Sequence, residues 1–152
     1  MAARSLAVRA AIKAELDKIG VTPSTGWESG AGAPGVTLGR PLLDALPKTP
    51  TRQIFVQCIG CDPMNELLGA VGNGYRHAYS VWLATQSEDL TANLERDVRR
   101  AMQLGAPNIQ LAGANGGVTE GEYRVHYEGV PAGWTVGTVI IFTDCLTAQG
   151  VL

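Results

Sequence analysis

The segment between residues 21 and 50 most constrains how this chain can fold, because ten of its thirty residues are glycine or proline. Neither a long helix nor a central strand can hold so many, since proline lacks a backbone donor and glycine has no side chain to pack. The segment nevertheless carries large apolar side chains, namely Trp27, Val36, Leu38, Leu42, Leu43 and Leu46. A disordered linker rarely contains so many of them. We therefore expect an extended, ordered arm that packs on its own domain or on a neighbouring subunit.

The residues before the arm predict an amphipathic helix over residues 2–19. Its apolar positions recur with the helical period at Val8, Ile12, Leu16 and Ile19, and Gly20 follows as a natural end. Charged residues interrupt this stretch, so it lacks the apolar core of a signal peptide. Since no run approaches the ~20 apolar residues of a membrane span, we expect no membrane partner.

Two apolar segments after the arm predict strands at residues 52–60 and 75–84. In the first strand, Ile54, Val56 and Cys58 are expected on one apolar face. In the second, alternation is expected to place every second residue on the same face. A loop over residues 61–74, with a helical turn at 65–71, is expected to connect the two strands.

A second helix is predicted from Ser87 to about Leu104. Ser87 is a favourable N-cap, while Gly105 and Pro107 are expected to end the helix. Helical spacing predicts a buried stripe that contains Leu90, Leu94, Val98, Ala101 and Met102.

The C-terminal part predicts a short strand at residues 108–112, a glycine-rich turn region at 113–121, and a hairpin with strands at 122–128 and 134–143. Its most apolar stretch, Val136–Phe142, should be a central strand. Short turns between sequential strands favour antiparallel pairing. The sequence thus predicts one α+β domain over residues 1–152, with a mostly antiparallel sheet of four to five strands, two helices packed on one face, and the arm at 21–50.

Charge is sparse in this chain. Charged residues make up 17% of the sequence, against about 25% in average soluble domains. The neutral surface that results often forms subunit interfaces. A net charge of −2 gives no general drive toward nucleic acid or acidic membranes.

Two short motifs could indicate cofactor sites. Residues 30–35 fit the pattern G-x-G-x-x-G, but no strand precedes them and no helix follows, so we interpret the match as chance. Cys58 and Cys61 form a C-x-x-C pair that ends a strand, whereas a redox motif belongs at a helix N-terminus. A zinc site would need further ligands, for which Cys145, His77 and His126 are the candidates.

No catalytic arrangement of nucleophile, base and acid stands out. Glu120, Glu122, Glu128 and Asp144 could be paired as an acid and a base, but solvated carboxylates of a hairpin are far commoner. We therefore expect neither an enzyme nor a cofactor site. Arg96, Arg99 and Arg100 form the only basic cluster, which is either a solvated helix face or a contact with an acidic partner or with DNA.

The layout resembles the tail terminator, or tail-completion, proteins of long-tailed bacteriophages. The resemblance rests on a short helix at residues 9–16, a strand at 52–59, an aromatic strand at 78–82, a helix at 87–104 and a final apolar strand at 136–142. It covers most of the chain and is one of pattern. The long arm and the C-x-x-C pair depart from the family.

The resemblance implies a virion protein of the tail or neck that is assembled in the host cytoplasm. It implies a homohexameric ring that caps the tail tube, contacts the tail tube protein on one face and the head–tail connector on the other, and lets DNA pass through its lumen. For contacts with neighbouring subunits, we expect residues of the arm and of the basic helix face: Trp27, Leu38, Leu42, Leu43, Arg96, Arg99 and Arg100.

Two alternatives stay open at the level of the sequence. The chain could be another ring protein of the same particle, such as a head–tail connector or a baseplate component. A different class of function would be a small zinc or redox protein that uses Cys58, Cys61 and Cys145.

Overall fold

The computed structural model describes residues 2–23, 25–63 and 72–148. Within these residues the chain forms helix α1 (Ala2–Leu16), strand β1 (Gly35–Leu38), a short 3-10 helix η1 (Leu43–Ala45), strands β2 (Gln53–Pro63) and β3 (Gly72–Thr85), helix α3 (Glu88–Leu111), and strands β4 (Gly117–His126) and β5 (Thr135–Ala148). The helical turn expected at residues 65–71 lies outside the described residues.

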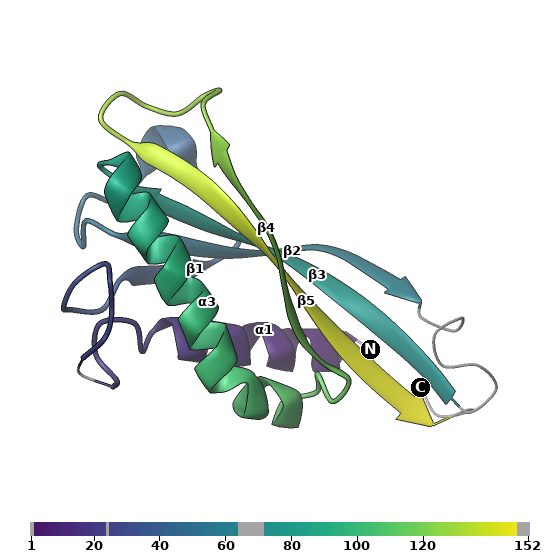
Figure 1. Cartoon of the computed structure of the whole chain (residues 1–152). Helices are drawn as coiled ribbons and strands as arrows, with labels where there is room; N and C mark the ends of the chain where they lie inside the picture. The colour runs from purple at the N-terminus through teal and green to yellow at the C-terminus, as the bar shows by residue number, and fades with distance from the viewer. Residues whose placement is uncertain (1, 24, 64–71, 149–152) are drawn as a thin grey trace.

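The described strands form one sheet of five strands in the order β1-β2-β3-β5-β4. Every neighbouring pair is antiparallel except β1 and β2, which run parallel. Both helices cover the same face of this twisted sheet (Figure 1). The predicted α+β fold is therefore confirmed, and β5 lies between β3 and β4 as the apolar run at its centre predicts.

The main core lies between the two helices and this face of the sheet. Val8, Ile12 and Leu16 are fully buried, which confirms the predicted stripe of the first helix. The helix ends at Leu16 rather than at residue 19, so Ile19, also fully buried, lies in the turn that follows. All four pack with residues of α3 and of the sheet, among them Leu94, Val98, Met102, Ile54, Val81 and Ile141. Successive residues of a strand point to opposite faces, so only alternate positions join this core.

The second helix is longer than the sequence predicts. It continues to Leu111, so the expected end at Gly105 and the expected strand at 108–112 are both wrong. Gly105 is buried and leaves room for the Glu15 side chain of α1, which a Cβ at this position would meet. Pro107 removes one helical hydrogen bond, but the exposed residues around it leave the freed carbonyl open to water.

Three smaller expectations also need correction. Leu90 is partly exposed rather than buried, because it lies in the first turn of α3. Strand β4 begins at Gly117, inside the region expected to be a turn. Strand β2 extends to Pro63 and carries a β-bulge between Cys58 and Gly60. Cys58 lies on the same face as Ile54 and Val56, as predicted, but its side chain is exposed rather than buried.

The arm contributes to the sheet rather than standing apart from it. Its residues 35–38 form the edge strand β1, which pairs with the start of β2. Its later residues form η1 and pack on the opposite face of the sheet from the helices. No helix in the described part of the chain has the length and apolar character needed to cross a membrane.

Candidate interaction surfaces

Two buried charged side chains hold the first loop of the arm against α3. Asp97, in the middle of α3, is only 1% exposed, and its carboxylate accepts hydrogen bonds from the backbone amides of Glu28 and Ser29, both at 2.8 Å. Arg52 donates to the Ser29 hydroxyl group at 2.7 Å and to the carbonyl groups of Ala31, at 3.3 Å, and Gly32. The glycine-rich loop is therefore fixed by buried side chains of two distant elements.

Burial has an electrostatic effect on this arginine. Desolvation lowers the pKa of the Arg52 guanidinium group, and the nearby carboxylate of Asp97 acts in the opposite direction. A buried cation needs such compensation, because its transfer out of water is costly unless charges or hydrogen bonds replace the solvent.

The three arginines of the predicted interface face elements of their own chain. Arg96 forms an ion pair with Glu28 at 3.2 Å. Arg100 donates to the carbonyl group of Gly26, and its guanidinium group lies 4.8 Å from the centre of the Trp27 ring. The structure thus brings Trp27 together with this basic cluster. Contact of Arg96 and Arg100 with a partner subunit stays a prediction.

Arg99 points to the other side of α3, toward β4. Its side chain donates to the carbonyl group of Gly121 at 2.9 Å and forms ion pairs with Glu95 and Glu120. Two of the other carboxylates considered for an acid–base pair also bind arginines of their own. Glu122 pairs with Arg124, and Asp144 pairs with Arg76 at 2.8 Å.

The apolar residues of the arm that were predicted to form an interface differ in their exposure to solvent. Trp27 is half-buried and packs against the main core. Leu38 and Leu42 are exposed, and the side chain of Leu42 retains 70% of its accessible surface. Leu43 is half-buried and packs on a second apolar cluster, which is formed by Leu46, Phe55, Ala84 and Val136 with Trp82, Val130 and Trp134.

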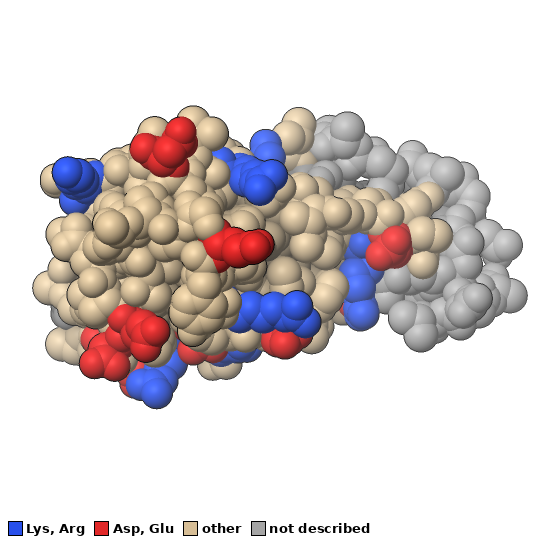
Figure 2. Space-filling view, turned by 90° about the horizontal axis from the view of Figure 1, so that it is seen from above, with Lys and Arg blue, Asp and Glu red and all other residues tan. Residues whose placement is uncertain are grey.

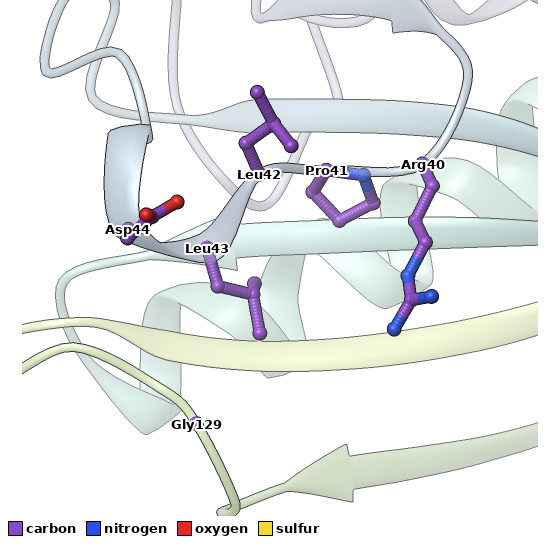
Figure 3. A pocket seen from close by; sticks show the side chains of 6 residues that line it. All are labelled: Arg40, Pro41, Leu42, Leu43, Asp44 and Gly129. Atoms are coloured by element: carbon purple, nitrogen blue, oxygen red, sulfur yellow. The ribbon is translucent and has the colours of Figure 1, made fainter.

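A shallow groove lies beside this second cluster. Its lining consists of Arg40, Pro41, Leu42, Leu43, Asp44 and Gly129, and its volume is about 430 Å³. In Figure 3, the side chain of Leu43 extends toward the β4–β5 turn, while Leu42 and Arg40 point in different directions. The groove therefore joins the arm to the hairpin turn at one end of the molecule.

The helix-free face of the sheet carries a row of side chains across four strands. Trp82 donates to Gln57 at 3.0 Å and stacks on His126, with ring centres 5.0 Å apart. His126 in turn contacts the Thr138 hydroxyl group at 2.8 Å. Further along this face, Arg76 lies over the ring of Phe142. Helices α1 and α3 do not cover this face, but the arm packs beside Trp82, so only the rest of the row is open to contact with another protein.

Charged side chains are scattered over the surface seen in Figure 2, with broad uncharged areas between them. This distribution follows from the low share of charged residues, 17% of the sequence. A mostly neutral surface costs little to desolvate, so it suits contacts between protein subunits.

The cysteines and histidines do not converge. The β-bulge places Cys58 opposite Tyr79 and Cys61 opposite His77, so both thiols share the face of the sheet that carries the helices. Both thiols are exposed, whereas His77 and Cys145 on the neighbouring strands are buried on the same face. Cys145 is buried on β5, with its sulfur 3.9 Å from Nδ1 of His77.

Strand β3 lies between the strands of Cys61 and Cys145, and His126 lies on the opposite face of the sheet. In the described part of the chain, no group of three or more His, Cys, Asp or Glu side chains is close enough to hold a metal ion. Burial lowers the pKa of His77, while desolvation followed by the neighbouring Cys58 and Asp62 raises the pKa of the Cys61 thiol. A raised pKa disfavours the thiolate that metal binding and redox chemistry need.

Sequence reasoning missed Arg52 and Asp97. One signal was present, because Asp97 falls three residues after Leu94 on the buried stripe of a helix, where an unpaired carboxylate would be costly. Its partners could not be found from spacing, since they lie 68 and 69 residues away in the sequence.

Comparison of the chain with models of protein families gives no match, and no curated protein matches it. The fold and its surfaces therefore carry the functional argument.

Proposed function

We propose that this chain is a structural, ring-forming subunit of a long bacteriophage tail, which caps the tail tube and joins it to the head-side connector. The observation that carries this proposal is the order α1-β2-β3-α3-β4-β5 in two layers, with both helices on one face. This is the order of elements on which the resemblance to tail terminator proteins rests. The ring form, its partners and its place in a virion belong to the proposal.

The character of the surface supports a subunit of a ring. A head-to-tail contact that closes into a ring needs two different complementary patches on each copy. The open part of the sheet face opposite α1 and α3, together with the groove at Arg40 to Asp44, is a candidate for one of these patches.

The charge distribution supports a ring through which DNA slides. A channel that binds phosphate groups strongly would slow the passage of DNA. The net charge is −2, and the arginine cluster of α3 is engaged by Glu28, Glu95, Glu120 and backbone carbonyl groups of the same chain.

Cryo-electron microscopy of tails assembled with and without this chain tests the proposal. We expect six-fold density that fits the described fold at the head-proximal end of the tube. Density at the distal end would favour a baseplate protein, and density on the head side of the joint would favour a connector. Tail particles that assemble and join heads normally without the chain would contradict the proposal.

Elemental analysis of the purified protein tests the alternative that the chain is a small zinc or redox protein. We expect no stoichiometric zinc, because Cys61 and Cys145 lie on strands that β3 separates. A metal ion retained at one equivalent per chain would favour the zinc protein instead.

A further inference from the structure

Several charged side chains lack an ion-pair partner among the described residues. Besides Arg9, Asp44 and Asp62, such side chains lie on the arm, at the start of α3 and in the β4–β5 turn. Arg40 and Lys48 belong to the arm, while Glu88 and Asp89 begin α3 and Glu128 lies in the β4–β5 turn. None of these five has an ion-pair partner among the described residues. Most other charged side chains of the described part have one, so these five are candidates for contact with another molecule.

The unpaired carboxylates at the start of α3 border a hollow between this helix and the β4–β5 hairpin. Two adjoining cavities, of about 220 Å³ and 280 Å³, share Glu88, Val125, Tyr127 and Thr135 as lining residues. The first is completed by His126, Val130 and Trp134, and the second by Asp89, Ala92 and Tyr123. We call the two together the hairpin groove.

The chemistry of the hairpin groove suits a guanidinium group. Its walls are aromatic and aliphatic, and the side chain of Tyr127 is 78% exposed. A flat cation can stack on such a ring while it donates hydrogen bonds to carboxylates at the rim. Burial, followed by the negative charges of Glu95 and Glu88, raises the pKa of Tyr123, which agrees with a negative local potential.

The same chain offers a matching cation. Arg40 is exposed at the groove beside η1, and its side chain has no ion-pair partner in the described structure. Arg40 and Glu88 line grooves that have no lining residue in common, and Asp44 lines the groove of Arg40. Two copies can therefore satisfy charges that one copy leaves unpaired.

We propose that Arg40 of one copy binds in the hairpin groove of a second copy, where it stacks on Tyr127 and pairs with Glu88 and Asp89. The occupant is a second copy because the two halves of the contact have opposite charge and occur on every chain. The inference rests on the proposed function, since this contact would join neighbouring subunits of the ring. It also identifies residues of that interface, whereas the order of helices and strands identifies none.

Sedimentation velocity of the full chain over a wide concentration range tests the contact. We expect the wild-type protein to self-associate, and Arg40→Glu to weaken self-association at least tenfold. Glu88→Arg should weaken it to a similar degree. The double variant R40E/E88R should recover most of the wild-type association, because the two charges are exchanged across the contact. Circular dichroism of each variant verifies that it folds.

Arg9→Glu is the matched control, because Arg9 also lacks an ion-pair partner among the residues that the structure describes but lies on α1. Equal effects of Arg9→Glu and Arg40→Glu would overturn the proposal, as would an R40E/E88R variant no better than either single variant. A wild-type chain that stays monomeric at every concentration would also overturn it.

The outcome is distinguishable from failure of the proposed function. A wild-type dimer that R40E dissociates and R40E/E88R restores would uphold the contact and count against a ring. Six-fold density at the tail end together with an unchanged R40E assembly would uphold the tail function and overturn the contact.

Discussion

Arg52 and Asp97 share one serine hydroxyl group: Ser29 accepts a hydrogen bond from Arg52 at 2.7 Å and donates one to the carboxylate of Asp97. Arg52 directly precedes β2 and Asp97 lies in the middle of α3, so this serine connects the arm to both layers of the fold. The arrangement explains how a loop rich in glycine acquires a defined path.

Replacement of Asp97 should therefore be costly. In Asp97→Ala, the amides of Glu28 and Ser29 lose their acceptor and Arg52 loses the nearby negative charge. We expect the free energy of unfolding to fall by about 3–5 kcal/mol, as when one partner of a buried charged pair is removed. Urea titration followed by circular dichroism measures it. Asp89→Ala, on the exposed first turn of the same helix, is the control, and an equal loss in both variants would contradict this account.

Gly20 should resist substitution for two separable reasons. Its φ of +77° disfavours any residue with a side chain, and a Cβ would collide with the carbonyl oxygen of Gly32. Gly133 has a similar φ of +85°, but nothing lies within 4 Å of the place a Cβ would take. We expect Gly133→Ala to cost about 1–2 kcal/mol and Gly20→Ala to cost clearly more. Thermal unfolding of both variants gives the difference, and equal losses would mean that the arm does not pack against this turn.

The thiols should react in two classes. Cys58 and Cys61 are exposed whereas Cys145 is buried, so a chromogenic disulfide reagent should modify two thiols rapidly and the third only on unfolding. In the Cys58→Ser variant, desolvation still raises the pKa of Cys61. Alkylation of Cys61 should then reach its half-maximal rate at a higher pH in the folded chain than in concentrated urea. A shift to lower pH would indicate an activated thiol and would favour a redox function.

Stability should fall on mild acidification because of His77. Burial lowers the pKa of this imidazole in the folded chain, below the ~6.5 expected when it is unfolded. As the pH falls below about 6.5, the unfolded chain therefore binds a proton at His77 more readily than the folded chain does. The free energy of unfolding then decreases until the pH reaches the lower pKa of His77 in the folded chain. Urea titrations at pH 7.5 and 5.5 measure the loss. His77→Gln should reduce it.

The sequence by itself determined the parts of this fold that depend on residues close together in the chain. The stripe of Val8, Ile12 and Leu16, the N-cap at Ser87 and the central strand around Val139 all follow from periodicity and local preference. The wrong boundary of α3 shows where this reasoning ends. Gly105 and Pro107 often end helices, but they do not do so here. Gly105 lies where the Glu15 side chain of α1 packs against α3, and a Cβ at this position would meet that side chain.

Only the tertiary structure decided how distant segments share their charges and surfaces. The bulge at Cys58 to Gly60 places both thiols on one face of the sheet. Strand β3 lies between β2 and β5, so it separates Cys61 from Cys145. Likewise, Asp97 gained its partners from the arm, and Arg40 was left without one. The physical reason for this division is that a local sequence pattern predicts only which side of a helix or strand is apolar. The partner of a charged side chain depends on contacts between residues far apart in the sequence. These contacts form only when the helices pack on the sheet.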